Sequence, residues 1–361
     1  MARKPKVWLL IGDKLGDNAQ VAAVARALDW PQEYRRLVFR EPYVLGKPRF
    51  APDLFHVDRQ RSDPIEPPWP DLILTIGRRP AMVALWIKRQ SGGRTRIVLF
   101  GRPKRHLHDF DLIVAPPQYH LPAADHVLPL DLPLIHPDTG AVEKAARDWR
   151  RRLEALPRPL LAVMVGGTTK PYRLDADAVQ GLLDQVHRAS GGRGTWYFST
   201  SRRTRPEAVA ALERQLPANA RLYRFGIDPP EDNPYRALLA LADGFVVTGD
   251  SVSMLVEVAR MGKPLGIYPL PLEKSWTTRM RYHAMRAMGY RPGRPLPAWM
   301  RTMLRLGWIG NLRDLEVIHQ SLYRKGWAVP LRDHRFPFPR SGTAVPDEIS
   351  KVVARIHALC E

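Results

Sequence analysis

The run 245–257 contains the residues whose types and spacing are best suited to chemistry. Its apolar start, with two β-branched valines, is typical of a buried parallel strand, and Gly249 allows a sharp turn into a helix. Backbone N–H groups at the start of such a helix, beside the hydroxyls of Ser251 and Ser253, form a natural phosphate site. Ser253 and Glu257 lie four residues apart on one helix face, so a ribose attached to that phosphate would lie near the Glu257 carboxylate.

The same run also has a simpler interpretation. Asp250 or Ser251 can cap the helix, and Glu257 is then an ordinary solvated side chain on its surface. Turns that lead from a strand through glycine and serine into a helix are common in proteins of many functions. The local pattern alone therefore leaves both interpretations open.

Two further loops in the second half are rich in small, hydroxyl or basic residues. The strand expected over 160–165 ends in Gly166, Gly167, Thr168, Thr169 and Lys170, and the strand over 195–199 runs into Thr200, Ser201, Arg202, Arg203 and Thr204. If these strands neighbour the one that ends at Thr248, all three loops converge on one crevice. Backbone amides and hydroxyls would then surround a pyrophosphate, and Lys170, Arg202 or Arg203 would neutralise its charge. Each loop alone is equally well explained as a turn with solvated charges, but three of them, with Glu257, favour a nucleotide-diphosphate site.

The corresponding loop of the first half is rich in glycine and acidic residues. It consists of Gly12, Asp13, Lys14, Leu15, Gly16, Asp17, Asn18, Ala19 and Gln20. Its glycines suit the close approach of a ligand, and Asp13 or Asp17 could be the general base for an acceptor hydroxyl. In the alternative interpretation, Asp17 or Asn18 caps the next helix and Asp13 is a turn residue.

Arg78 and Arg79, between Gly77 and Pro80, form a basic turn from a strand into a helix. The turn could bind a phosphorylated acceptor or a membrane headgroup. Exposed loop charge explains it equally well. The candidate acceptor side therefore consists of Gly12, Lys14, Gly16, Asn18, Gln20, Arg78 and Arg79.

The elements that must position these loops alternate between strands and helices. The first half has strands expected over 6–11, 33–39, 71–76, 96–100, 110–115 and 126–130, with helices over 18–28 and 80–90. The second half repeats the alternation, with helices over 175–189 and from Asn233 to Ala242 and further strands over 221–225 and 264–268. Strands interleaved with helices of this length predict parallel, doubly wound sheets. Thr204 and Glu207 also resemble a capping box, with Pro206 in the first helical turn.

The predicted fold class is therefore α/β, with two Rossmann-like doubly wound domains facing each other across a cleft. Residues 1–137 form the N-terminal domain on the acceptor side, and 138–158 form a linker helix. Residues 159–337 form the domain on the donor side, and 338–361 form a tail with a terminal helix.

The composition is that of a soluble globular protein with an unusual charge. The 361 residues are 45% hydrophobic and 25% charged, and 56 Lys and Arg against 36 Asp and Glu give a net charge of +20. Suitable partners are an anionic membrane surface, a phosphorylated small molecule or nucleic acid. Nucleic acid is the least favoured, because the basic residues are spread along the chain and no nucleic-acid-binding motif is present.

Several classes of protein are excluded by what the sequence lacks. No apolar run is long enough to span a membrane, and the run 7–11 is too short for the core of a signal peptide. Cys360 stands alone, which excludes internal disulfides and fits the cytoplasm. The Walker A, H-E-x-x-H and G-x-S-x-G patterns are missing, and the first strand lacks G-x-G-x-x-G. The histidines are scattered without metal-ligand spacing, so neither a metal nor a cofactor is expected, and a nucleotide-diphosphate sugar would be a substrate.

Several segments together resemble the mitochondrial-fission "elongated mitochondria" family. They are 12–20, 166–170, 200–204, 233–235 and 248–254, and the similarity extends over about residues 6–335. The resemblance implies a fold like that of GT-B glycosyltransferases. In those enzymes a helix start rich in Ser and Gly holds the donor pyrophosphate and a Glu holds the ribose. By position, this implies a phosphate at Ser251 and Ser253 and a ribose at Glu257. Thr248, Asp250 and Met254 of the same run are further candidates for donor binding.

Two functions are expected from these observations. The first is a metal-independent glycosyltransferase that uses a nucleotide-diphosphate sugar on an envelope or lipid-linked acceptor. It would be cytoplasmic and peripheral on the inner face of the membrane. The second is a non-catalytic peripheral-membrane adaptor that retains the fold, because plant members of the family are described as adaptors that recruit a dynamin-related protein.

Overall fold

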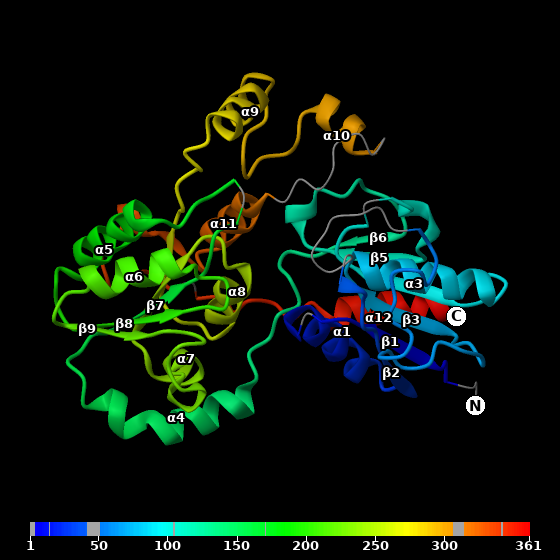
Figure 1. Ribbon diagram of the computed structural model, residues 1–361, viewed down its shortest axis with the longest axis horizontal. Helices are drawn as coiled ribbons and strands as arrows, with labels where there is room; N and C mark the ends of the chain where they lie inside the picture. Colours follow the sequence, from blue (N-terminus) through cyan, green and yellow to red (C-terminus); the bar gives the residue numbers. More distant parts are fainter. Residues whose placement is uncertain are drawn as a thin grey trace. The chain divides into compact units, whose positions relative to one another are not determined.

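The computed structural model describes residues 4–13, 15–41, 51–103, 105–169, 171–305, 314–340 and 342–361. The chain divides into two compact units, each built from separated segments (Figure 1). The first unit is Met1–Ile135 with Leu296–Arg313 and Pro346–Glu361, and the second is His136–Pro295 with Asp314–Val345. No helix in the described ranges is long and apolar enough to cross a membrane.

The first unit contains a six-stranded parallel sheet in the order β2-β1-β3-β4-β5-β6. Its strands are β1 Val7–Ile11, β2 Gln32–Arg36, β3 Leu72–Ile76, β4 Arg96–Phe100, β5 Leu112–Ala115 and β6 Val127–Pro129. Successive strand residues point to opposite faces, so Leu10 and Ile97 pack on one side with α3, Arg78–Gln90. Leu9 and Val98 pack on the other side with α1, Leu15–Leu28, and α12, Ile349–Cys360.

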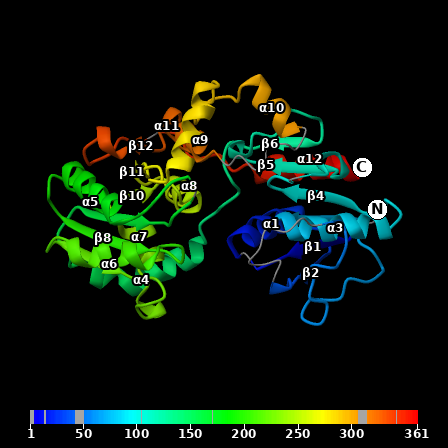
Figure 2. The same ribbon diagram turned by 45° about the horizontal axis from the view of Figure 1, so that its top comes forward.

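The terminal helix α12 is part of the first unit. Its buried Val352 and Ile356 join the apolar cluster formed by α1 and the sheet, and the ring of His357 lies edge-on to Trp30 with 4.8 Å between centroids. Figure 2 shows α12, in red, beside β5. A further α-helix of this unit is α10, Ala298–Arg305.

The second unit contains another six-stranded sheet, in the order β12-β11-β10-β7-β8-β9, and all its strand pairs are parallel. Its strands are β7 Leu160–Val165, β8 Thr195–Thr200, β9 Ala220–Tyr223, β10 Gly244–Thr248, β11 Leu265–Tyr268 and β12 Val329–Pro330. The helices are α4 Thr139–Glu154, α5 Ala176–Ser190, α6 Pro206–Gln215, α7 Tyr235–Leu241, α8 Val252–Arg260, α9 Trp276–Ala287 and α11 Leu315–Arg324. The helices α5 and α6 pack on one face with the side chains of Val163 and Phe198, and Figure 1 shows α7 on the opposite side with α4 beyond it.

These two sheets confirm the predicted α/β class with two Rossmann-like, GT-B-like domains. That the two domains face each other across a cleft stays a prediction. The predicted helix between the domains forms as α4, whose N-cap Asp138 accepts a hydrogen bond from the Ala141 N–H, and it packs against α7 within the second unit. The strand β12 was not predicted, because it has two residues and ends in a proline.

Candidate functional site

Three neighbouring strands of the second unit deliver the predicted donor loops to one edge of the sheet. β10 pairs with β7 and β7 pairs with β8, all in parallel. The loops after Val165, Thr200 and Thr248 therefore leave the sheet side by side. The adjacency on which the predicted crevice depended is confirmed.

A buried carboxylate ties two of these loops together. Asp250 is fully buried and accepts hydrogen bonds from the Gly167 N–H and the Thr248 hydroxyl, each at 2.8 Å. The guanidinium of Arg203 lies 3.2 Å from Oδ2 of the same carboxylate. Burial raises the pKa of Asp250, and the hydrogen bonds from Gly167 and Thr248 and the charge of Arg203 oppose the rise. We call this group, with Gly166, the Asp250 clasp.

The two glycines of the clasp are required by close packing. A Cβ on Gly166 would lie 2.4 Å from Oδ1 of Asp250, and a Cβ on Gly167 would lie 2.2 Å from the backbone oxygen of Arg203. The Gly166 N–H also donates to the Thr248 hydroxyl at 2.8 Å. The Gly-Gly pair therefore allows the close approach of protein groups. Its two N–H groups, which lie in a loop expected to surround a pyrophosphate, donate to Thr248 and Asp250 instead.

Arg203 links all three loops. Its guanidinium donates to the hydroxyl of Thr169 at 3.1 Å and to that of Ser251 at 3.5 Å, besides its ion pair with Asp250. Thr168 is half-buried in the same loop, and Lys170 lies outside the described residues. The charge of Arg203 is thus largely used within the protein.

The start of α8 has no side-chain cap, contrary to the simpler interpretation of this run. The N-cap residue is Ser251, whose side chain makes no capping hydrogen bond, and the first turn contains no acidic residue. The Asp250 carboxylate is held in the clasp instead. The expected side-chain cap at Asp250 or Ser251 is therefore wrong. The N–H groups of the first turn, near the exposed Ser253, receive no hydrogen bond from a capping side chain.

The capping box expected at Thr204 is also wrong. The helix α6 begins at Pro206 after Arg205, without a side-chain cap. The Thr204 hydroxyl donates instead toward the backbone oxygens of Val165, at 3.1 Å, and Gly166, at 2.5 Å. The Thr204 hydroxyl therefore bonds to the backbone at the end of β7. This tertiary contact outweighs the local preference of the sequence for a capping box.

The turn before α8 is held from behind by α11. Nε2 of the buried His319 donates to the backbone oxygen of Gly249 at 2.7 Å, and its Nδ1 lies 3.3 Å from a carboxylate oxygen of Glu316. A Cβ on Gly249 would lie 2.7 Å from the His319 ring. The contact with His319 holds the pKa of Glu316 below its usual value.

Glu257 lines a cavity of about 670 Å³. The walls come from α4, the end of β8, the segment after β9 and the starts of α7 and α8: Ala141, Lys144, Ala145, Asp148, Trp149, Ser199, Thr200, Ser201, Arg202, Phe225, Pro230, Glu231, Asn233, Tyr235, Arg236, Met254 and Glu257. We call this cavity the Glu257 pocket. It contains four of the predicted donor residues, Ser201, Arg202, Met254 and Glu257.

Glu257 is half-buried and accepts a hydrogen bond from the hydroxyl of Tyr235. Burial raises the pKa of Glu257, against the opposing effects of this hydrogen bond and the charge of Arg236. Burial also raises the pKa of Tyr235 well above its usual value, and the neighbouring carboxylate adds to the rise. The interpretation of Glu257 as an ordinary solvated glutamate is therefore wrong.

Sequence reasoning missed the far wall of the Glu257 pocket. Asn233 was expected only as the start of a helix and, with Tyr235, as part of the family resemblance. Trp149 and Phe225 were given no role in a site. The Asn233 side chain accepts from the Tyr235 N–H at 3.0 Å, which fixes the start of α7. Aromatic faces with polar groups beside them suit a planar heterocyclic base.

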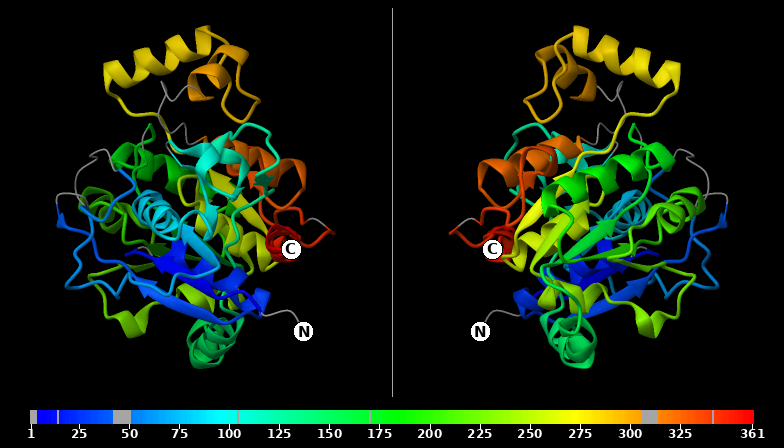
Figure 3. Two further views of the ribbon diagram at one scale, coloured as in Figure 1. Left: turned by 90° about the vertical axis from the view of Figure 1, so that its right-hand side faces the viewer. Right: turned by 90° about the vertical axis from the view of Figure 1, so that its left-hand side faces the viewer.

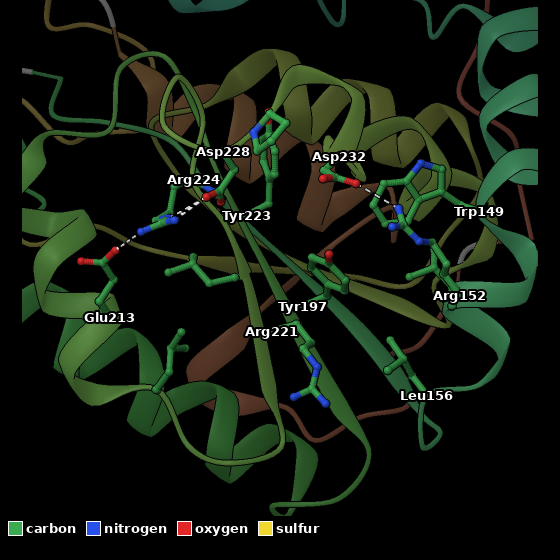
Figure 4. Close-up of a pocket in the computed structure, with 14 residues that line it drawn as sticks. Trp149, Arg152, Leu156, Tyr197, Glu213, Arg221, Tyr223, Arg224, Asp228 and Asp232 are labelled. Carbon is green, nitrogen blue, oxygen red and sulfur yellow. Dashed lines mark hydrogen bonds and ion pairs between the residues drawn. The ribbon is translucent and has the colours of Figure 1, made fainter.

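A second cavity of about 660 Å³ lies on the same unit, along β9 (Figure 4). Arg224 is paired with Glu213 at 2.7 Å and with Asp228 at 2.5 Å, and Arg152 is paired with Asp232 at 3.0 Å. Arg152 also lies over the Trp149 ring, 4.9 Å from its centroid. Two of the three arginines that line this cavity are thus neutralised by carboxylates, and the third, Arg221, donates to the backbone oxygen of Ala220.

The predicted acceptor residues of the first unit are arranged differently. Asp13 is exposed and forms an ion pair with Arg79 at 3.1 Å, and the guanidinium of Arg79 lies over the Phe39 ring, 4.6 Å from its centroid. α1 begins at Leu15, so Asp17 and Asn18 lie within the helix, and the cap expected at either residue is wrong. The Asn18 side chain instead donates to the Gly12 backbone oxygen at 2.9 Å.

The other acceptor candidates are placed only in part. Lys14 and the side chain of Asp17 lie outside the described residues, Gly16 lies in α1, and Gln20 is half-buried in the same helix. Arg78 and Arg79 are the first residues of α3, after Gly77 with a φ of 90°. Burial lowers the pKa of Arg78, and the neighbouring charge of Arg79 adds to this effect.

The described ranges contain no obvious set of metal ligands. Within them, no group of three or more His, Cys, Asp or Glu side chains comes together in a form that could hold a metal ion. Metal-independent chemistry stays a prediction.

Comparison with known proteins identifies the family. The model of the family described as mitochondrial fission ELM1 matches residues 16–296. The chain belongs to the mitochondrial fission ELM1 family. The mitochondrial fission protein ELM1 of Arabidopsis thaliana is 28% identical over 218 residues, which cover 54% of this chain and 51% of the plant protein. The match thus spans about half the length of this plant member.

Two further proteins are similar. An uncharacterised protein of Rickettsia prowazekii (strain Madrid E) is 25% identical over 304 residues, which cover 73% of this chain and 83% of that protein. Among solved structures, the UDP-GlcNAc 2-epimerase of Neisseria meningitidis, bound to UDP-GlcNAc, is 11% identical with a TM-score of 0.46. That similarity covers 98% of this chain and 99% of the epimerase chain.

Proposed function

We propose that this ELM1-family protein binds a nucleotide-diphosphate sugar in its second unit and transfers the sugar in a metal-independent reaction. The observation that carries the proposal is the state of Glu257. Its carboxylate is half-buried, has a raised pKa and faces a cavity of about 670 Å³. Tyr235, whose hydroxyl donates a hydrogen bond to this carboxylate, lines the same cavity. A carboxylate in this position can accept hydrogen bonds from both hydroxyls of a ribose.

The start of α8 supplies the second part of the proposed site. Four residues of helix rise about 6 Å, so Ser253 and Glu257 are separated by roughly the span between a nucleotide phosphate and its ribose hydroxyls. The N–H groups of the first turn and the helix dipole favour the phosphate. Arg202 is exposed and lines the pocket, so it is the better candidate for neutralising the phosphate than Arg203, which pairs with Asp250.

The proposed acceptor carries a hydroxyl and is linked to the cell envelope or to a lipid. Asp13 or Asp17 of the first unit would remove the proton from this hydroxyl as the sugar is transferred. The protein would work in the cytoplasm, on the inner face of an anionic membrane that attracts its net charge of +20.

A non-catalytic adaptor that retains the fold is the second candidate. The observation that favours it is the ion pair between Asp13 and Arg79, which leaves one candidate base engaged with a protein cation. The plant relative is described as a mitochondrial fission protein, which also fits an adaptor.

Calorimetric titration tests the binding step. We expect UDP, GDP, ADP or CDP, or the corresponding sugar nucleotide, to bind the wild type, and Glu257→Gln to weaken that binding by about tenfold or more, because hydrogen bonds to a charged group are worth about 1.5–3 kcal/mol. Glu213→Gln is the matched control, because Glu213 lines the other cavity. No binding by any of these nucleotides, or equal binding by wild type and Glu257→Gln, would contradict the proposal.

Turnover separates the two candidates. A transferase should release the nucleoside diphosphate from its sugar nucleotide, and Glu257→Gln should slow the release. Asp13→Asn should slow it too if Asp13, and not Asp17, is the base. An adaptor should bind the nucleotide without releasing any product, and its binding to a partner should be indifferent to Glu257→Gln.

A further inference from the structure

The helix α9 of the second unit has an apolar face that is exposed. Trp276 and Met280 are 70% and 51% exposed. Ala284 and Ala287 are exposed as well, and their spacing places them on the same side of the helix as Trp276 and Met280. Figures 1 and 3 show α9, in yellow, projecting from the sheet of its unit.

The orientation of this face is fixed by the two ends of the segment. Before the helix, the Glu273 N–H donates to the backbone oxygen of Pro171 at 2.8 Å. After it, Tyr290 is buried and the Gly293 N–H donates to Asp314 at 3.1 Å. Tyr282 and Met285 are half-buried on the opposite side of the helix, so the apolar face points away from the unit.

The charged residues of the segment that carries this face have a single sign, and one of them, Lys274, is paired with Asp177 of α5 at 2.5 Å. The segment 274–295 contains no Asp or Glu, and its basic residues are Lys274, Arg279, Arg281, Arg286, Arg291 and Arg294. Arg279 and Arg286 are both exposed. They occupy neighbouring positions beside the apolar face, because they are seven residues apart, which is about two turns.

This combination matches the physical chemistry of a membrane surface. A helix that lies in the lipid interface buries Trp and other apolar side chains on one face and presents Lys and Arg to the headgroups. Each basic residue near an anionic surface favours binding, and a segment without acidic residues meets no opposing repulsion. An exposed Trp next to an exposed Met is unusual on a surface that remains in water.

We propose that α9 attaches this protein to an anionic lipid bilayer by lying in the plane of the interface. Attachment by α9 would bring the protein to the lipid-linked acceptor of the proposed function, and only this purpose of the attachment rests on that function. Among the residues whose side chains the structure describes, α9 contributes none to the Glu257 pocket, so lipid binding and nucleotide binding can be measured independently.

Flotation with phospholipid vesicles tests the apolar face. We expect the wild type to float with vesicles that contain about 30% phosphatidylglycerol and to float far less with pure phosphatidylcholine. The double variant Trp276→Ala, Met280→Ala should lose about tenfold or more in partitioning. Ile227→Ala is the matched control, because this residue is 61% exposed elsewhere on the same unit, and it should bind as the wild type does.

The charge contribution is tested with arginine pairs. The double variant Arg279→Gln, Arg286→Gln should reduce partitioning by about fivefold for each arginine and should weaken its dependence on salt. The pair Arg188→Gln, Arg193→Gln, which removes two exposed arginines in and just after the last turn of α5, should have a much smaller effect.

The outcomes separate the two proposals. A wild type that does not bind anionic vesicles, or α9 variants that bind them as well as the controls do, would overturn the proposal and leave the face to a protein partner. Titration of the same variants with UDP, GDP, ADP and CDP should give unchanged affinities. Loss of lipid binding with intact nucleotide binding supports α9 alone, and absence of nucleotide binding in the wild type contradicts only the proposed transferase.

Discussion

Asp250 and Glu257 are two acidic residues of one strand–helix unit. Burial has the same effect on the pKa of both, but the two carboxylates differ in the hydrogen bonds that they accept. Burial raises the pKa of both carboxyl groups. Asp250 is satisfied on all sides by Gly167, Thr248 and Arg203, whereas Glu257 accepts a hydrogen bond from Tyr235 and faces an open cavity. A carboxylate saturated by the protein holds loops together, and one with spare acceptor capacity is available to a ligand.

The largest effect should follow from removing the saturated carboxylate. Asp250→Ala leaves the Gly167 N–H, the Thr248 hydroxyl and the Arg203 guanidinium without their acceptor, and we expect it to lower the free energy of unfolding by about 3 kcal/mol or more. Glu257→Ala should lower it by less than about 1 kcal/mol, since water in the pocket can replace the carboxylate. Urea denaturation measures both values, and equal losses would remove the distinction between the two sites.

The next effect concerns the glycine that approaches the clasp. Gly167→Ala would place a methyl group against the backbone oxygen of Arg203, so we expect a loss of about 2–3 kcal/mol in the free energy of unfolding. Gly140→Ala is the control, because its Cβ meets nothing closer than 3.8 Å and it lies in a helix, where alanine should stabilise by about 0.5–1 kcal/mol. If both variants were stabilised, the clasp would not be tightly packed.

A smaller effect should appear in the pH dependence of stability. Because the pKa of Glu257 is raised in the folded state, the folded protein holds this proton more tightly than the unfolded chain does. Its contribution is therefore present at pH values below the ordinary glutamate pKa of 4.5 and is lost as the pH rises through the folded-state value. The stability of Glu257→Gln, measured relative to wild type, should thus increase with pH across this window, and a difference that does not change with pH would show that Glu257 is solvated.

The smallest effect is expected in the first unit. Asp13→Asn removes an ion pair whose aspartate is 54% exposed, and such surface pairs contribute about 0–1 kcal/mol. Thermal unfolding should therefore change little, while product release should fall if Asp13 is the base. A large loss of stability would instead assign Asp13 a structural role like that of Asp250.

The fold was largely predictable because buried parallel strands are apolar throughout. The strand over 160–165 was predicted at its observed bounds, and the alternation of strands and helices was sufficient to identify two doubly wound sheets. The strand β12 escaped prediction because two residues ending in proline have no period.

The site was predictable only where its residues follow one another along the chain. Glu257 and the start of α8 could be found by helical spacing. The partners of Asp250 could not, because Gly167 and Arg203 are brought to it by strand pairing over long sequence separations. The same is true of Trp149 on α4, whose place in the Glu257 pocket depends on the packing of α4 against α7.

A crystal structure of the protein with a bound nucleoside diphosphate would test the central claim most directly. The account predicts that the ribose hydroxyls lie within hydrogen-bond distance of the Glu257 carboxylate and that the pyrophosphate lies against the N–H groups of the first turn of α8. The Asp250 clasp should be unchanged. The account would be contradicted by a nucleotide bound along β9 in the cavity of Figure 4. It would also be contradicted if, at a saturating concentration of nucleotide, the Glu257 carboxylate accepted a hydrogen bond from Tyr235 but none from the nucleotide.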